Sequence, residues 1–345
     1  MLHLNIACTI MIHSVGFKLT YYIIWILINL FNILLQYVSI SQFLIFPNYF
    51  DPLSIFIYSI EYTEMVHAQL NKTSLANRHR IISIYRHIYL IIYFVVLQVA
   101  VMTRWKEQYC GATLIAPQWV LTAAHCVRKK GRKRKVILKI GELDLGEYEE
   151  TELTVHPAKD FPHPDFDYAT ITNDIALIKL KRAVESDKIK FACLPDKRDK
   201  VRRKTLCYTI GWGKTKNTLI YGSEKLQEAR VPIVNRRRCQ SVFNYDITDT
   251  QVCAGYKRGG VDSCAGDSGG PLMCSREDNN GVKRWFIYGV TSYGEGCGRK
   301  GKYGIYTKVS SYLSMHSDPE EIRVVPLLSQ CYYFLWLSHR LQRNL

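Results

Sequence analysis

The segment DSCAGDSGGPL, residues 262–272, is the most informative stretch of this 345-residue chain. It places Ser268 among glycines, with one aspartate directly before it and another six residues before it. By itself, GDSGG is also consistent with a tight turn. Two further segments give it a chemical meaning, because LTAAHC (121–126) supplies a histidine and TNDIALIKL (172–180) supplies an aspartate.

These three segments together contain the residue types that nucleophilic catalysis needs. A serine hydroxyl is a poor nucleophile at neutral pH, so an imidazole must take its proton and a carboxylate must orient that imidazole. His125, Asp174 and Ser268 occur in an order that differs from the orders in subtilisins and α/β-hydrolases. Each residue alone also has an ordinary structural explanation, and the catalytic interpretation rests on their occurrence together.

The sequence around these segments favours an all-β fold. From about Leu97 to Ser314, short β-rich runs alternate with turn residues and no long amphipathic helix interrupts them, which is typical of a barrel or sandwich. The end of the apolar run Ile88–Met102 is predicted to be a buried strand. The other predicted strands are Gln118–Thr122, Val136–Ile140, Asp174–Leu180, Trp285–Ser292 and Gly304–Val309.

Residues 97–314 resemble the trypsin/chymotrypsin family of serine proteases. The resemblance implies two six-stranded antiparallel barrels, here with an atypical N-terminal extension and incomplete ends of the domain. It also implies that His125 is the general base and acid, that Asp174 orients it, and that Ser268 forms an acyl-enzyme. The backbone N–H groups of Gly266 and Ser268 would form the oxyanion hole, and no cofactor is required for this chemistry.

The same resemblance places Asp262 at the base of the primary specificity pocket. A buried carboxylate without an internal partner is costly, so the Arg or Lys of a substrate would supply the missing cation. Gly294 and Gly304 match the pocket walls, and Ser292 with the backbone around Gly294 would pair with the substrate as an added strand. We therefore expect an endopeptidase that cuts after Arg or Lys and that is bound by serine protease inhibitors.

The chain has eleven cysteines, which is many for a cytosolic protein and points to an oxidising compartment. Because the number is odd, at least one cysteine has no internal partner. By the resemblance, the disulfides are Cys110–Cys126, Cys207–Cys274, Cys239–Cys253 and Cys264–Cys297. Cys193 occupies the position that tethers the catalytic chain to a pro-segment in two-chain members of the family, while Cys8 and Cys331 remain unassigned. We expect a secreted, extracellular protein.

Two charged regions suggest ligands. The segment 141–152, GELDLGEYEETE, resembles the calcium loop of trypsins, with Glu142, Glu149 and Glu152 at the ligand positions, although a glutamate-rich loop can also be merely solvated. The net charge is +16, and the basic runs are RKKGRKRK (128–135), KRDKVRRK (197–204) and RRR (236–238). These are either solvated loops or a surface for glycosaminoglycan, anionic lipid or acidic protein, and nucleic acid is not expected outside the cell.

Activation is where the sequence departs from the family. Family members form a new N-terminus of the type Ile-Val-Gly-Gly, whose ammonium pairs with the aspartate before the nucleophile, here Asp267. The nearest match, Arg80-Ile81-Ile82-Ser83, lacks both glycines. An alternative therefore stays open, in which the protein is a catalytically silent, zymogen-like homologue that binds polyanions through its basic loops.

The two ends of the chain have no assigned function. Residues 1–96 form an uncertain N-terminal region with a candidate signal anchor or membrane segment near 21–46, where Tyr21–Leu35 is long and apolar. The alternative is that this region is poorly structured or absent from the mature protein. Residues 315–345 form an uncertain C-terminal tail, and membrane anchoring is left open.

Overall fold

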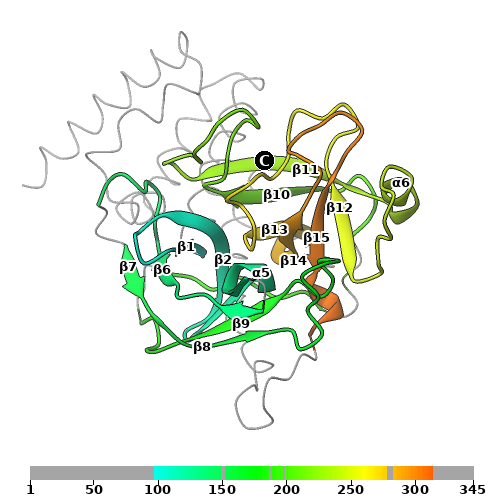
Figure 1. Cartoon of the computed structure of the whole chain (residues 1–345). Coiled ribbons are helices and arrows are strands. Elements are labelled where there is room, and N and C mark those ends of the chain that lie inside the picture. Colours follow the sequence, from blue (N-terminus) through cyan, green and yellow to red (C-terminus); the bar gives the residue numbers. More distant parts are fainter. Residues whose placement is uncertain are drawn as a thin grey trace, which may run out of the picture. The chain divides into compact units, whose positions relative to one another are not determined.

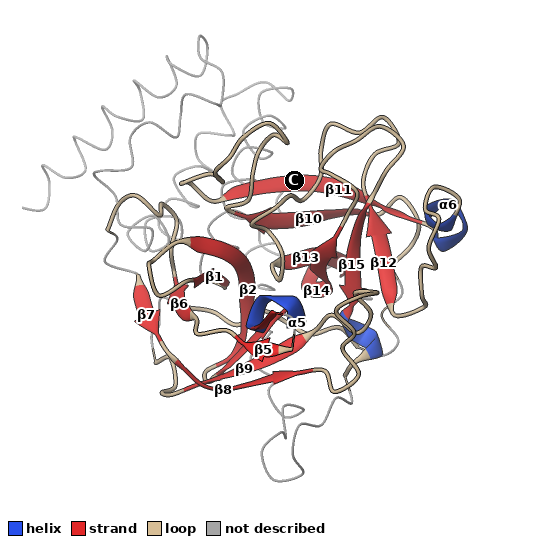
Figure 2. Cartoon of the chain, in the orientation of Figure 1, coloured by secondary structure: helices blue, strands red, loops and turns tan. Residues whose placement is uncertain are grey.

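The computed structural model describes residues 97–313, except residues 130, 149–151, 186–188, 197, 198, 200 and 278–282. In this part of the chain, antiparallel strands form two large sheets and one short hairpin (Figure 1, Figure 2). The predicted all-β class is confirmed.

The first sheet has seven strands in the order β7-β6-β1-β2-β3-β9-β8. Their bounds are β1 (Gln98–Met102), β2 (Gln108–Ala116), β3 (Trp119–Thr122), β6 (Ile137–Ile140), β7 (Leu153–Val155), β8 (Pro157–Pro162) and β9 (Ala176–Leu180). This sheet curls into a half-barrel with β7 and β8 at its edges, which is consistent with the first of the two barrels that the resemblance implied. His156 alone separates these two edge strands, and Pro157, which has no N–H to donate to a ladder, begins the second of them.

The second sheet is a closed barrel of six strands in the order β10-β11-β12-β15-β14-β13, as predicted. Their bounds are β10 (Leu206–Gly211), β11 (Gln227–Val234), β12 (Gln251–Ala254), β13 (Pro271–Glu277), β14 (Lys283–Tyr293) and β15 (Gly304–Lys308). The apolar run Ile88–Met102 ends in the buried strand β1, as predicted. The five other strands predicted from the sequence are also found, as β3, β6, β9, β14 and β15.

Aliphatic side chains explain why the first sheet forms. In β6 the residues alternate, so that Leu138 and Ile140 have no exposed surface while Lys139 points to the other face. Leu114 of β2 and Ile178 of β9 are equally buried in the same core. Burial of one such side chain contributes about 1.5–3 kcal/mol. This packing holds β3 and β9, and two of the predicted site residues lie just outside these strands, His125 after the end of β3 and Asp174 before the start of β9.

All four disulfides that the resemblance implied are present, and they join Cys110 to Cys126, Cys207 to Cys274, Cys239 to Cys253 and Cys264 to Cys297. Each typically contributes about 2–4 kcal/mol to stability. They indicate that the protein folds in an oxidising compartment. Cys193 is 3% exposed. Cys8 and Cys331 lie outside the described residues.

Helices are short in the described part of the chain. They are α5 (Ala124–Val127), α6 (Arg236–Gln240) and the 3-10 turn η2 (Val309–Ser311), and the hairpin that follows α5 pairs β4 (Arg128–Lys129) with β5 (Arg132–Lys133). None of the helices among these residues has the length and apolarity that a membrane crossing requires. The candidate membrane segment near 21–46 lies outside the described residues.

Candidate active site

His125 lies on a single helical turn that follows directly from β3. The N–H of Cys126 donates to the carbonyl of Ala123 at 3.1 Å, and the sulfur of Cys126 is bonded to Cys110 on β2. These two links fix the turn against the sheet. The side chain of His125 is left 21% exposed, so a molecule at the surface can reach the imidazole.

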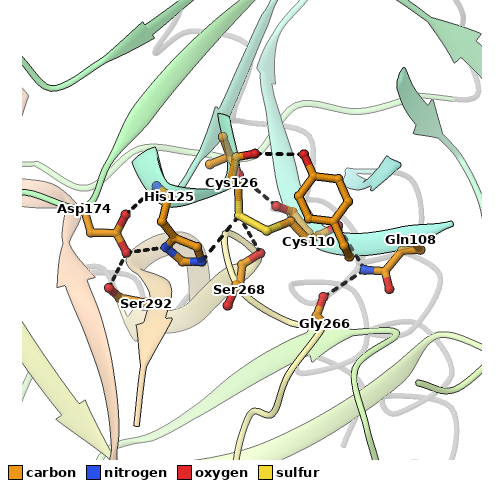
Figure 3. Close-up of a disulfide and its surroundings, with 11 residues drawn as sticks. Gln108, Cys110, His125, Cys126, Asp174, Gly266, Ser268 and Ser292 are labelled. Atoms are coloured by element: carbon orange, nitrogen blue, oxygen red, sulfur yellow. Dashed lines mark hydrogen bonds and ion pairs between the residues drawn. A yellow bond between two sulfur atoms is a disulfide. The ribbon is translucent and has the colours of Figure 1, made fainter. Parts of the chain in front are cut away.

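Asp174 is buried beneath this histidine and is only 1% exposed. Its Oδ1 accepts the backbone N–H of His125 at 3.0 Å, and its Oδ2 lies 2.7 Å from Nδ1 of the imidazole (Figure 3). Oδ2 also accepts the hydroxyl of Ser292, and the carbonyl of Asp174 accepts Thr307 Oγ1 at 2.8 Å. An ionised carboxylate only accepts hydrogen bonds, so this contact places a proton on Nδ1, and in the neutral imidazole Nε2 is then an acceptor.

Ser292 therefore has a role that the sequence did not indicate. The resemblance assigned it to substrate binding through the backbone of β14, whereas the structure directs its 5%-exposed side chain to the carboxylate of Asp174. The two residues are 118 positions apart. No local pattern in the sequence reports a contact of this range.

The backbone of Ser268 packs against the segment that carries His125. The Ser268 carbonyl accepts the N–H of Gly111 at 2.7 Å, and Cys126 Sγ lies 3.4 Å from the same carbonyl oxygen and 3.8 Å from Nε2 of His125. Figure 3 shows Ser268 beside the imidazole, next to the Cys110–Cys126 disulfide. The described residues include no hydrogen bond between the Ser268 hydroxyl and Nε2, a contact that is often long before substrate binds.

Two backbone N–H groups next to Ser268 point to a site for a developing negative charge. Among the described residues, the N–H groups of Gly266 and Ser268 donate to no acceptor. Gly266 has a φ of +104°, and a Cβ there would lie 2.8 Å from the Cα of Gly213. The side-chain amide of Gln108 holds this loop, since it donates to the carbonyls of Gly266 at 2.8 Å and of Cys110 at 2.9 Å. No pattern in the sequence indicated this role for Gln108.

Asp267, the residue before Ser268, lines a cavity of about 190 Å³. Its carboxylate accepts the N–H groups of Gly213 at 2.7 Å and of Cys264 at 2.8 Å, and no described cation forms an ion pair with it. A Cβ at Gly211 or Gly213 would lie within 2.5 Å of this carboxyl group, so both positions require glycine. Burial raises the pKa of Asp267 to about 6, against the lowering effect of the two N–H donors.

Asp262 lines the same cavity. Its carboxylate accepts the N–H of Ser263 at 2.9 Å and of Gly298 at 3.1 Å, again without an ion pair to a described cation. Burial raises the pKa of Asp262 to about 6. The Cys264–Cys297 disulfide joins the two segments that supply these contacts, so the carboxylate is held in a defined place without a positive partner.

The two predicted wall glycines differ in their surroundings. A Cβ at Gly304 would lie 2.6 Å from Oδ1 of Asp262, so any side chain there would displace the carboxylate. A Cβ at Gly294 would meet its nearest atom, the carbonyl of Gly296, at 3.4 Å, which is ordinary contact. The fold therefore requires glycine at 304, whereas it would accommodate a Cβ at 294.

A lysine occupies the predicted calcium loop. Lys139 Nζ lies 2.9 Å from Oε2 of Glu142 and 2.6 Å from Oε1 of Glu152, and both carboxylates are almost fully buried. Burial lowers the pKa of Lys139, but the hydrogen bonds and charges of the two glutamates outweigh it and raise the pKa. The ammonium of Lys139 thus occupies the position between the two carboxylates that a calcium ion would take. With the lysine in this position, these residues do not fit Ca²⁺. The third predicted ligand, Glu149, lies outside the described residues.

The structure thus brings His125 and Asp174 together next to the backbone of Ser268, and places Asp262 in a neighbouring cavity. A comparison with protein families agrees with this arrangement, because residues 93–315 match the family model described as Trypsin. The match covers more than half of the chain.

Proposed function

This chain belongs to the trypsin family of serine peptidases, and we propose that it is an endopeptidase that hydrolyses peptide bonds after Arg or Lys. Members of this family act on proteins and generally need no cofactor. One observation carries the proposal. The His125–Asp174 pair lies beside Ser268, where the N–H groups of Gly266 and Ser268 have no acceptor among the described residues.

In the proposed reaction, Ser268 Oγ attacks the substrate carbonyl carbon while Nε2 of His125 takes its proton. The N–H groups of Gly266 and Ser268 stabilise the negative oxygen of the tetrahedral intermediate, and loss of one such donor typically costs about 10²–10³ in rate. The imidazolium, stabilised by Asp174, then protonates the leaving amine. Water releases the acyl group from Ser268 by the same steps, which restores the hydroxyl and the neutral imidazole.

Specificity for Arg or Lys follows from Asp262. Two backbone donors hold its carboxylate, but no described side chain neutralises it. A guanidinium or ammonium group from the substrate would supply that charge. Glycine at 304 lets the carboxylate hold this position, because a Cβ there would lie 2.6 Å from its Oδ1. Inhibitors that present Arg or Lys would occupy the same pocket.

Structural calcium is the less favoured part of the sequence-based interpretation. The carboxylates of Glu142 and Glu152 already share the ammonium of Lys139, so a divalent ion would have to displace a positive charge of the chain. We therefore propose that Lys139, and not calcium, stabilises this loop. A stability of the protein that depends on calcium would contradict this proposal.

A second candidate function rests on Asp267. Its buried carboxylate has no cation among the described residues, and in the trypsin family the ammonium of a new N-terminus supplies one. Without that ammonium, the chain would be a silent, zymogen-like protein whose basic loops bind glycosaminoglycan or another polyanion. Both candidates place the protein outside the cell, and neither requires a membrane anchor near 21–46.

One experiment separates the two candidates. The secreted protein is assayed with a fluorogenic Arg amide before and after limited cleavage by immobilised trypsin, which is then removed. Turnover that disappears in Ser268→Ala supports the endopeptidase. Heparin binding without turnover in either state supports the silent homologue. N-terminal sequencing of the mature protein identifies the cleavage that produces the active form.

A further inference from the structure

One asparagine side chain joins two loops that border the cavity of Asp262. Asn217 lies in the loop that connects β10 to β11 (Figure 1). Its Nδ2 donates to the carbonyl of Cys297 at 2.7 Å, and its Oδ1 accepts the N–H of Cys297 at 2.9 Å. The two residues are 80 positions apart. The amide therefore bonds to both backbone groups of one residue, as the backbone of a paired strand would.

Within the described part of the chain, the backbone of Cys297 has no hydrogen-bond partner except Asn217. Strand β14 ends at Tyr293, so the ladder of the closed barrel does not reach this residue. The disulfide to Cys264 fixes the side chain of Cys297 but forms no bond with its peptide groups. The orientation of these peptide groups therefore depends on the amide of Asn217.

The carbonyl of Cys297 belongs to the peptide unit that holds the carboxylate of Asp262. The N–H of Gly298, at the other end of this unit, donates to Oδ2 of Asp262 at 3.1 Å. Cys297 and Gly298 both line the cavity that contains Asp262. Because a peptide unit is planar, the hydrogen bond from Asn217 to the carbonyl also fixes the direction of the N–H that reaches Asp262.

The loop of Asn217 is itself held in place. The N–H of Lys214 donates to the carbonyl of Ala265 at 2.9 Å, which attaches the start of the loop to the segment between Asp262 and Ser268. The N–H of Leu219 donates to the carbonyl of Lys216 at 3.2 Å, and Asn217 is the second residue of the turn that this bond closes. The loop thus links the two segments that form the cavity.

We propose that Asn217 is a positioning residue for substrate specificity, which orients the peptide unit of Cys297 and Gly298 so that Asp262 can receive an Arg or Lys side chain. The inference rests on the proposed function, because it requires that side chain to enter this cavity. The hydrogen bonds of the Asn217 side chain reach neither His125 nor Ser268. Its loss should therefore weaken binding of the cationic side chain and leave acyl transfer almost unchanged.

Benzamidine is a suitable probe, because its amidinium resembles the guanidinium of Arg and it is not cleaved. With the secreted, activated chain, we expect Asn217→Ala to raise the inhibition constant of benzamidine about fivefold to tenfold, the effect of two exposed hydrogen bonds. The KM of an Arg amide should rise by a similar factor, while kcat stays nearly unchanged. An unchanged inhibition constant overturns the inference.

Hydrolysis of para-nitrophenyl acetate separates the pocket from the catalytic groups. This ester has no cationic side chain, so its hydrolysis depends on Ser268 and His125 but not on Asp262. Asn217→Ala should hydrolyse it at the rate of the unsubstituted chain. Equal losses with the ester and with the Arg amide would show a general distortion of the site, which overturns a role in specificity.

Two further variants serve as controls. Asn217→Gln keeps the amide on a longer side chain and should recover part of the affinity for benzamidine. Asn235→Ala removes an asparagine whose Oδ1 accepts the N–H of Arg238 at 2.9 Å at the start of α6 and which does not line the cavity. Its inhibition constant should not change. An equal increase in both alanine variants reflects lower stability and overturns the inference.

Hydrogen exchange covers the case in which the chain binds no benzamidine, an outcome that contradicts the proposed function instead. The N–H of Cys297 donates to Asn217, so its exchange should be faster in the full Asn217→Ala chain than in the unsubstituted chain. Unchanged exchange of the peptide that contains Cys297 and Gly298 overturns the positioning role. Turnover of the Arg amide with an unchanged inhibition constant overturns this inference alone and leaves the proposed function intact.

Discussion

Ser292 donates a hydrogen bond to Asp174 Oδ2, the same oxygen that lies 2.7 Å from Nδ1 of His125. One carboxylate oxygen thus links the end of β14 to the helical turn after β3. The curled sheet and the closed barrel therefore meet at Asp174, and the orientation of the imidazole depends on contacts from both.

Removal of the Ser292 hydroxyl should weaken this arrangement without abolishing it. Ser292→Ala leaves Asp174 with the backbone N–H and imidazole of His125 as donors, so we expect kcat to fall about tenfold to a hundredfold, the effect of one hydrogen bond to a charged group. Steady-state kinetics with an Arg amide measures this. Ser292→Thr keeps a hydroxyl and should recover most of the loss, and an equal loss in both variants would show that the hydroxyl has no such role.

Replacement of Asp262 should remove the preference for Arg. Asp262→Ser leaves the guanidinium of the substrate without its partner, a loss of about 3–5 kcal/mol for a buried pair, so kcat/KM should fall by more than a hundredfold. Circular dichroism should show an intact fold, because no described cation depends on this carboxylate. Unchanged turnover of Arg substrates would remove Asp262 from the specificity pocket.

In the uncleaved protein, ionisation of Asp267 should lower the stability of the folded state. Its pKa is raised from 3.8 to about 6, so the folded state binds the proton more tightly than the unfolded state. The stabilisation from this group is complete below about pH 3.8 and is lost as the pH rises through about 6. The Tm of Asp267→Asn should therefore rise relative to the unsubstituted chain between pH 4 and about 7. Parallel Tm curves across this range would contradict the prediction.

The ammonium of Lys139 should make the stability of the loop independent of calcium. Addition of calcium or of a chelator should leave the Tm of the protein unchanged, because Glu142 and Glu152 already have their cation. Lys139→Gln removes one partner of a buried pair and should destabilise the fold by up to about 3 kcal/mol. Calcium should recover part of that loss in the variant only, and a clear Tm increase in the unsubstituted chain would refute the assignment.

Local patterns in the sequence were sufficient to select the candidate catalytic residues. His125, Asp174 and Ser268 each occur in a distinctive short segment, and the resemblance built on those segments also implied the four disulfides. The strands were predicted because β-rich apolar runs between turns reflect burial directly.

Contacts between distant segments could not be predicted in this way. Ser292 and Asp174 are far apart in the chain, and Gln108 reaches Gly266 across 158 positions. The glutamates of the acidic loop suggested a calcium site. The sequence pattern did not show that Lys139 of the preceding strand forms ion pairs with two of them.

The most direct test of the account is the reactivity of Ser268. The secreted, activated protein is treated with a fluorophosphonate that carries an Arg-like group, and the adduct is located by intact mass and peptide mapping. We predict one adduct per chain, on Ser268, which benzamidine suppresses and which His125→Ala prevents. No adduct, or adducts spread over other hydroxyl groups under conditions that label trypsin fully, would contradict the convergence of these side chains into an active site.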